Sequence, residues 1–306
     1  MIKFYLLIGV ELITFPFLYL WEEVKKYLGK YKKQRAGYKT TGLDISNDAI
    51  FIIHEWAGYP YVRFKTINYT GHKFVCGLKY HFERLSQYQG KYHIKKILTI
   101  SDYTKEYYES LKKESFYDDK TQVYAVDNSA MDFSGYAHVV ENILVEEKDD
   151  KVVFLTNSSV EAEMVAFLDN HIELFKSQPE LGLLGISYST KIYQTLIKNN
   201  FRPHLQSFFL VSKVSVLKEM IELNGGRFPG AKEHYKLSII RFGEVKITEL
   251  IQKLGYKVAV ITEDEELHTL PDHGLFFNGY ANWELPLNDY RLSANHPNRI
   301  NVLKHE

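Results

Sequence analysis

Short apolar runs alternate with helix-like stretches along most of this chain. The strand-like runs lie at residues 49–54, 95–101, 122–126, 152–156, 181–187, 207–211 and 257–261. Helix-like stretches fall between them at residues 103–113, 136–145, 160–175, 214–223 and 244–254. This alternation predicts an α/β fold with a doubly wound, mostly parallel sheet and flanking helices. Residues 225–240 and the chain after residue 270 lack a clear period, and we expect loops there that cover the site.

The first 35 residues follow a different pattern. Residues 4–21 read FYLLIGVELITFPFLYLW and are nearly all apolar, and a basic cluster follows at Lys25, Lys26, Lys30, Lys32, Lys33 and Arg35. An apolar helix followed by positive charge predicts attachment to the inner leaflet, on the cytoplasmic face of the cell membrane. Gly9, Glu11 and Pro16 weaken a straight spanning helix. The alternative is a helix packed on the rest of the chain or on a second subunit.

The polar, glycine-containing residues 36–47 are expected to form a linker, which leaves residues 48–306 as the globular domain. Thirty-eight basic residues balance 38 acidic ones, so no global positive field favours nucleic acid. The single cysteine, Cys76, excludes an intrachain disulfide framework and a Cys-rich zinc site. The sequence has no glycine-rich dinucleotide fingerprint, no P-loop and no serine nucleophile elbow. Dinucleotide oxidoreductases and P-loop kinases are therefore poor candidates.

Four polar signatures occur in order, each where an apolar run gives way to a loop or helix. They are DNSAMDFSGY from Asp127, VVFLTNSSV from Val152, PHLQSFFLV from Pro203 and GEVKIT from Gly243. In open α/β sheets, ligands bind at the carboxyl ends of the strands. The four signatures therefore predict one assembled site.

In this order and spacing, the signatures resemble those of bacterial polysaccharide glycosyltransferases of the rhamnan-synthesis F type, over residues 50–261. The resemblance implies a GT-A-like fold. It also implies transfer of a sugar, such as rhamnose or another deoxyhexose, from a nucleotide-sugar donor to a cell-surface glycan or a lipid-linked acceptor. Such a transferase would act in polysaccharide biosynthesis of the cell envelope.

Asn157, Ser158 and Ser159 follow a buried-strand pattern, where metal-dependent GT-A enzymes usually place Asp-x-Asp. The related proteins often carry an aspartate here. Mg²⁺ and Mn²⁺ prefer carboxylate oxygens, so its loss weakens the case for either metal unless Glu161, Glu163 or a distant group helps. The alternative is a helix N-cap, in which Ser158 or Ser159 accepts backbone N–H bonds from a helix over residues 160–175.

The resemblance places Asp127, Asn128 and Asp132 beside the donor, where they would bind sugar or ribose hydroxyls. Aspartate and asparagine are also common turn residues. Strand alternation would put His204 and Gln206 on one face and Ser207 on the other. The pair would clamp hydroxyls or a pyrophosphate oxygen, unless His204 only satisfies loop backbone.

Glu244 is expected at a helix N-terminus, at the rim of the sheet. A carboxylate there could remove the proton of the acceptor hydroxyl, which makes Glu244 the candidate base. The alternative is a first-turn glutamate stabilised by the helix dipole.

Two further groups are candidates for the site. His54, Glu55 and Trp56 follow the first strand-like run and could line the nucleotide pocket, where the indole could stack on the base. The alternative is a strand-end cluster with a half-buried tryptophan. His268, Asp272 and His273 have the residue types of a metal site but are more often surface residues. Two hypotheses remain, a membrane-associated glycosyltransferase and a non-catalytic protein of the same fold that binds glycan or a partner.

Overall fold

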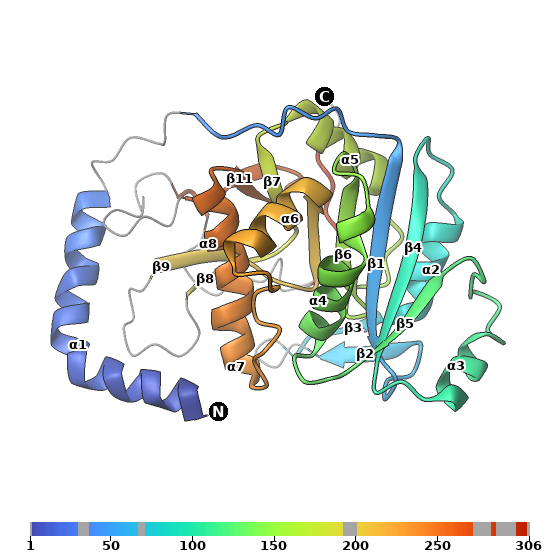
Figure 1. Ribbon diagram of the computed structural model, residues 1–306, viewed down its shortest axis with the longest axis horizontal. Coiled ribbons are helices and arrows are strands. Elements are labelled where there is room, and N and C mark those ends of the chain that lie inside the picture. The colour runs from blue at the N-terminus through green and yellow to red at the C-terminus, as the bar shows by residue number, and fades with distance from the viewer. Residues whose placement is uncertain are drawn as a thin grey trace.

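The computed structural model describes residues 2–29, 37–66, 71–191, 201–271, 283–285 and 298–304. An eight-stranded sheet with helices on both faces forms its centre (Figure 1). The strands are β1 Asp48–Trp56, β4 His93–Ser101, β5 Gln122–Val126, β6 Val152–Asn157, β7 Leu181–Gly185, β10 Phe209–Lys213, β11 Lys257–Ile261 and β12 Leu267–Thr269. Two small hairpins add β2 Arg63–Thr66 with β3 Lys73–Cys76, and β8 Tyr188–Lys191 with β9 Phe201–Leu205.

The helices are α1 Ile2–Gly29, α2 Leu78–Ser86, α3 Lys105–Leu111, α4 Asp132–Asn142, α5 Leu168–Ser177, α6 Val214–Leu223, α7 Lys236–Ile239 and α8 Val245–Leu254. A 3₁₀ turn, η1 Leu144–Glu146, follows α4, and a π-helical turn, η2 Ile240–Glu244, joins α7 to α8.

The strand order is β12-β11-β7-β10-β6-β1-β4-β5. Strand β1 pairs in parallel with β4 and β6, and β7 pairs in parallel with β11. Strand β10 is antiparallel to both β6 and β7, and β12 is antiparallel to β11. The predicted mostly parallel α/β sheet with flanking helices is therefore confirmed.

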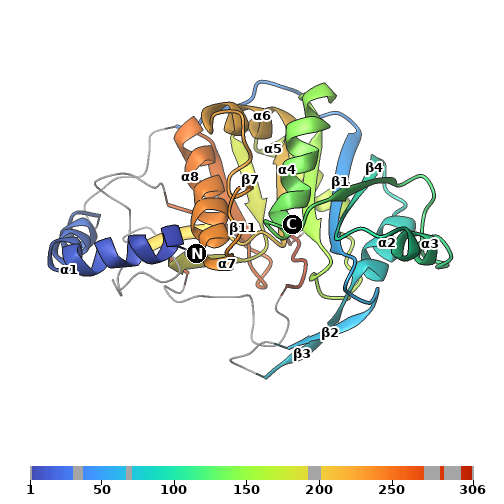
Figure 2. The ribbon, with the colours of Figure 1, turned by 60° about the horizontal axis from the view of Figure 1, so that its bottom comes forward.

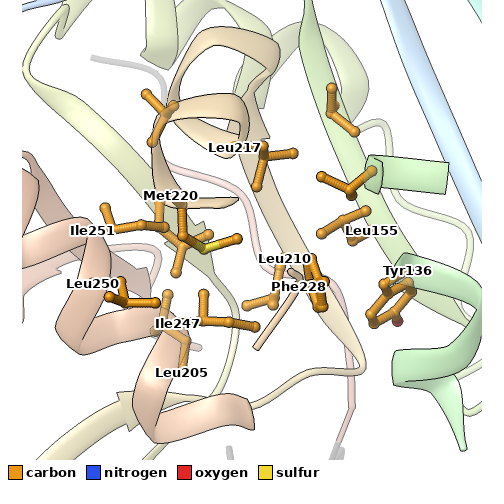
Figure 3. Close-up of a cluster of buried hydrophobic side chains, with 14 of the residues drawn as sticks. Tyr136, Leu155, Leu205, Leu210, Leu217, Met220, Phe228, Ile247, Leu250 and Ile251 are labelled. Atoms are coloured by element: carbon orange, nitrogen blue, oxygen red, sulfur yellow. The ribbon is translucent and has the colours of Figure 1, made fainter. Parts of the chain in front are cut away.

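Alternate residues of each central strand pack into one of two cores, because successive side chains in a strand point to opposite faces. In β1, Ile50 and Ile52 join the core beneath α4, α6 and α8. Figure 3 shows this cluster around Leu155, Leu210 and Met220. Ala49, Phe51 and Ile53 join the opposite core, against α2 and α5.

Several sequence-based boundaries are wrong. Helix α5 begins at Leu168 instead of residue 160, so Ser158 and Ser159 do not cap it. The strand predicted at residues 207–211 is β10, which begins at Phe209 and not at residue 207. Within the expected loop at 225–240, residues 236–239 form helix α7.

Helix α1 is present as predicted, and its window Phe4–Trp21 is long and apolar enough to cross a membrane. Only 11% of that window is buried. The basic positions Lys30, Lys32, Lys33 and Arg35 lie outside the described residues. In the expected linker, the backbone N–H of Lys39 donates to Gly255 O at 2.9 Å, so the segment contacts the domain. The division into residues 1–35, 36–47 and 48–306 stays a prediction.

Candidate functional site

A cavity of about 460 Å³ opens where β1 and β6 end. The register pairs His54 with Asn157, which brings these two strand ends level. The turn between β9 and β10 and one side of the α7–η2 segment complete the cavity. The lining residues are His54, Glu55, Trp56, Tyr59, Arg63, Lys65, Asn128, Met131, Asp132, Phe133, Asn157, Ser158, Ser159, Gln206, Ser207, Phe208, Lys236, Ile239, Ile240, Glu244 and Asn298.

Most of the sequence-predicted site residues are brought together here. Nine of them line the cavity: His54, Trp56, Asn128, Asp132, Asn157, Ser158, Gln206, Ser207 and Glu244. Asp127 and His204 are not among the lining residues. Each of the four polar signatures therefore contributes at least one side chain to the same cavity.

Ser207 connects two carboxylates in the cavity. Its hydroxyl donates to Asp132 Oδ2 at 2.8 Å, and its backbone N–H donates to Glu244 Oε1 at 2.9 Å. The Asn157 side-chain amide donates to the same Asp132 oxygen at 3.0 Å. Burial raises the pKa of Asp132, and the bonds from Ser207 and Asn157 oppose that rise. Both carboxylates are thus held in fixed positions by the ends of neighbouring elements.

Glu244 does not lie at a helix N-terminus. It ends the π-helical turn η2, inside a helical stretch that begins at Lys236 and runs through α8. The helix-like stretch predicted at residues 244–254 in fact continues a helical segment that begins earlier. Glycine is needed at Gly243 because a Cβ there would overlap the Phe133 ring. π turns inside helices occur frequently at functional sites. This one places Glu244 against Ser207 in the cavity.

His204 lies behind the cavity, and its expected pairing with Gln206 as a clamp is corrected. It is fully buried on β9, where its Nδ1 lies 2.8 Å from Arg202 O. Its Nε2 is 3.9 Å from Glu244 Oε2. Strand alternation does not extend to Gln206, because β9 ends at Leu205 and Gln206 lies in the following turn. In this position His204 lies beside Glu244 but is not among the residues that line the cavity.

Asp127 stabilises a turn, which was the alternative to a role in donor binding. Its Oδ1 accepts bonds from the Ser129 backbone at 2.7 Å and from the Ser134 hydroxyl at 3.1 Å. The Ser129 hydroxyl also donates to it and contributes most to lowering the pKa of Asp127. Asp127 thus shapes the loop that leads into α4, while Asn128 and Asp132 reach the cavity.

Glu55, one of the candidates for the nucleotide pocket, is buried beside Arg63, and this contact was not predicted from the sequence. Glu55 is 1% exposed and accepts bonds from the Ser158 hydroxyl at 2.8 Å and from the Trp56 N–H at 2.9 Å. Arg63 Nη1 lies 3.7 Å from Glu55 Oε2, and Arg63 Nη2 donates to Ser158 Oγ at 2.8 Å. Burial raises the pKa of Glu55 to about 7, against the opposing charge of Arg63. The available signal was a charged residue that directly extends a buried strand run.

Trp56 and Asn128 are held by another residue that was not predicted. The Trp56 indole N–H and the Asn128 amide both donate to Asp102 Oδ2, at 2.6 and 2.9 Å. The Tyr59 ring meets the indole edge-on, with 4.7 Å between centroids. An aromatic wall and an amide thus lie together on one side of the cavity. His54, by contrast, is 5% exposed and bonded to Thr99 at 3.1 Å, and burial lowers its pKa to about 4.

The described side chains around the cavity do not form a carboxylate cluster for Mg²⁺ or Mn²⁺. The residues described by the structure contain no group of three or more His, Cys, Asp or Glu side chains that could hold a metal. Ser158 stands at the expected metal position and is bonded to the guanidinium of Arg63. The positive charge of Arg63 therefore already lies beside Ser158, and it disfavours binding of a metal cation there. His268 lies near Glu266 and Glu284, whereas Asp272 and His273 are outside the described residues.

No family model matches the chain, and no curated protein matches its sequence. The resemblance to the rhamnan-synthesis F type thus stays a prediction. Among solved structures, a mannosyltransferase from Pyrobaculum calidifontis in complex with GDP-Man and Mn²⁺ is similar, with a TM-score of 0.42 and 13% identity. The match covers 87% of this chain and 69% of that one.

A second similar structure is 4-diphosphocytidyl-2C-methyl-D-erythritol synthase from Anaerococcus prevotii, with a TM-score of 0.39 and 14% identity over 78% of this chain and 91% of that one. A third is 2-C-methyl-D-erythritol 4-phosphate cytidylyltransferase from Francisella tularensis. Its TM-score is 0.37 at 14% identity, over 68% of this chain and 87% of that one. These structures are too distant from this chain to indicate its function.

Proposed function

We propose that this protein is a nucleotide-sugar-dependent glycosyltransferase and that the cavity binds the donor. The observation that carries the proposal is the pair of carboxylates, Asp132 and Glu244, fixed by Ser207 in a cavity that also contains cationic and aromatic side chains. Apolar walls with a few convergent polar groups are typical of small-molecule sites. A nucleotide sugar has complementary parts: an aromatic base, a diphosphate and a hydroxyl-rich ring.

The proposed donor lies with its base against Trp56 and Tyr59 and its diphosphate near the cationic side chains. Arg63, Lys65 and Lys236 are the cations in the lining. Guanidinium and ammonium groups bind phosphate oxygens through charge-assisted hydrogen bonds. In this arrangement they neutralise the diphosphate leaving group in place of Mg²⁺ or Mn²⁺. Asn128 and Gln206 supply amides for ribose or sugar hydroxyls.

Glu244 is the proposed general base. Its carboxylate removes the proton of the acceptor hydroxyl while that oxygen bonds to the anomeric carbon and the bond from this carbon to the diphosphate oxygen breaks. The Ser207 N–H fixes Oε1, and His204 lies 3.9 Å from Oε2. One carboxylate oxygen is therefore anchored while the other remains beside an imidazole. Asp132 is held nearby and is the proposed contact for sugar hydroxyls.

The proposed acceptor is a glycan or lipid-linked molecule at the cytoplasmic face of the cell membrane. Helix α1 supports this location, because its large apolar side chains are mostly exposed. The sugar remains rhamnose or another deoxyhexose by resemblance, in keeping with polysaccharide biosynthesis of the cell envelope.

The test is to incubate the purified full-length chain with a panel of nucleotide sugars and follow donor hydrolysis and binding, in Mn²⁺ and in EDTA. We expect one donor class to bind and to be hydrolysed slowly, at similar rates in both conditions. Binding of a nucleotide sugar without turnover in the presence of acceptor extracts would favour the non-catalytic alternative. Binding of no member of the panel would contradict the proposal.

A further inference from the structure

A second hollow lies on the other side of the helical stretch that carries Glu244. It has a volume of about 630 Å³ and is formed by the loop after α6 and by residues of η2 and α8. Five basic residues line it: Arg202, Arg227, Lys232, Arg241 and Lys246. The acidic lining residues are Glu233 and Glu249, and Lys246 Nζ lies 4.0 Å from Glu249 Oε2. Two carboxylates outside the lining, Glu141 and Glu11, pair with Arg227 and Arg241, so the hollow keeps only a small positive excess.

Helix α1 is fixed directly to this basic hollow. Arg241 Nη2 lies 2.9 Å from Glu11 Oε1, and both side chains are mostly buried. Phe4 is fully buried, and its ring centroid lies 5.5 Å from that of Tyr235. Figures 1 and 2 both show the N-terminal end of α1 beside α7. The hollow and the N-terminal part of α1 therefore lie next to each other.

The Glu11–Arg241 ion pair also limits how α1 can meet a membrane. Glu11 lies inside the apolar window Phe4–Trp21, and a spanning helix would carry it into hydrocarbon away from Arg241. Uncompensated charge within a bilayer is costly. A helix that lies along the membrane surface keeps the pair and still buries its exposed apolar side chains in the interface.

We propose that the basic hollow beside α1 binds the anionic headgroups of a lipid bilayer, and that α1 lies in the plane of that bilayer. An apolar helix combined with basic residues gives the two signals needed for stable surface attachment. The proposal rests on membrane attachment through α1, which is part of the proposed function, but not on sugar transfer. Because Glu244 and Arg241 lie on the same π turn, such docking would bring the cavity close to the membrane surface.

The experiment is flotation of the full-length chain, synthesised in the presence of vesicles of phosphatidylcholine alone or with about 30% phosphatidylglycerol. The variant Lys232→Glu with Lys246→Glu is compared with Lys105→Glu plus Lys113→Glu. The control pair makes the same charge change at α3 and just after it, outside the hollow. Circular dichroism and thermal unfolding of each variant check that the fold is kept.

We expect the parent and the control to partition more strongly onto anionic than onto neutral vesicles. The variant in the hollow should lose about 20-fold or more of its partitioning onto anionic vesicles and change little on neutral ones, since each basic residue near an anionic surface contributes roughly fivefold. Equal losses in the two double variants, or no anionic preference in the parent, would overturn the proposal.

Two further outcomes separate related ideas. If the parent floats with neither vesicle, attachment through α1 fails together with the headgroup site, whatever the transferase assay shows. If it binds both vesicles equally, only the headgroup site fails. Inorganic phosphate at constant ionic strength should not displace the chain from anionic vesicles, and displacement would instead assign the hollow to free phosphate.

Discussion

Burial sets the ionisation of the acidic and imidazole groups beside the cavity. The pKa of Glu55 is raised to about 7 by burial, although Arg63 and Ser158 favour its charged form. Burial also raises the pKa of Asp132 and lowers that of His54 to about 4. At neutral pH the imidazole of His54 is therefore uncharged, and Glu55 is close to its midpoint. The fraction of Glu55 that is negatively charged, and therefore balances the positive charge of Arg63, consequently rises with pH around neutrality.

The ionisation of Glu55 should make stability depend on pH. In the unfolded chain this carboxyl titrates near its ordinary value of 4.5, whereas in the fold its pKa is about 7. Between these values the folded state binds more protons, so stability falls as pH rises from about 4.5 to about 7 and then levels off. The full effect is about 3 kcal/mol.

Glu55→Gln removes this titration, and urea unfolding over a pH series measures it. Parent stability relative to the variant should decrease by roughly 2–3 kcal/mol from pH 4.5 to 8. The comparison with the variant matters because the buried histidines His54, His81 and His171, whose pKa values are lowered, give the opposite slope in both proteins. A difference that stays constant with pH would show that Glu55 titrates normally.

Close packing of elements fixes the walls of the cavity. Helix α4 crosses β1 and β4 at Gly135, where a Cβ would overlap the His54 ring and the Thr99 hydroxyl. The helical stretch from α7 to α8 similarly approaches Phe133 through Gly243. Because these two glycines have no side chain, α4 packs closely against both the sheet and the segment that carries Glu244. Small displacements of α4 would therefore alter the cavity.

Gly135→Ala should destabilise the protein although alanine favours helices. Overpacking at such a contact costs about 1–3 kcal/mol, and the His54–Thr99 hydrogen bond would be disturbed. Chemical denaturation measures the change in the free energy of unfolding. Gly9→Ala in α1 is the matched control, because a Cβ added there would meet no atom within 4 Å, and it should have little effect. Equal stabilities of the two variants would mean that α4 has room to shift.

The local sequence pattern predicted some elements with the same bounds that they have in the structure. Strands β5 and β11 and helix α6 have the residues expected from the sequence. The stretch before α5 has apolar residues at helical spacing, but tertiary contacts hold it extended. Arg84 donates to the carbonyls of Glu161 and Glu163, and Ala162 N–H donates to Val75 O. These partners are distant in sequence and leave no local signal.

The candidate site shows the same limit. Asn157 ends β6, and Asp132 begins the helix that follows β5. Both could be placed by position alone, because parallel strands end at one edge of the sheet. Arg63 lies on the separate β2–β3 hairpin, so its contact with Ser158 depends on how that hairpin packs. His204 likewise lies outside the cavity because of where β9 ends, and the sequence did not indicate that boundary.

At the scale of the whole molecule, α1 contacts the domain through its N-terminal half, where Phe4 meets Tyr235 and Glu11 meets Arg241. Deleting residues 1–35 removes the Phe4–Tyr235 contact and the Glu11–Arg241 pair but none of the central sheet. We expect the truncated chain to move from the membrane fraction to the soluble fraction and to keep its circular dichroism spectrum. An insoluble, unfolded product would show that α1 contributes to the core and would contradict its role as an anchor.

The central claim is that Glu244 removes the acceptor proton in a donor-binding cavity. Glu244→Gln keeps the shape of the side chain and an oxygen able to accept the Ser207 N–H, but it deletes the base. Glu222→Gln, on the exposed part of α6, is the matched control.

The decisive measurement compares transfer rate with donor affinity in these variants, using the donor found in the nucleotide-sugar panel. We predict that Glu244→Gln lowers transfer by on the order of 10²–10⁴ while donor affinity stays within a few-fold of the parent, and that the control changes neither. Transfer by Glu244→Gln within a few-fold of the parent rate would contradict the assignment of the base.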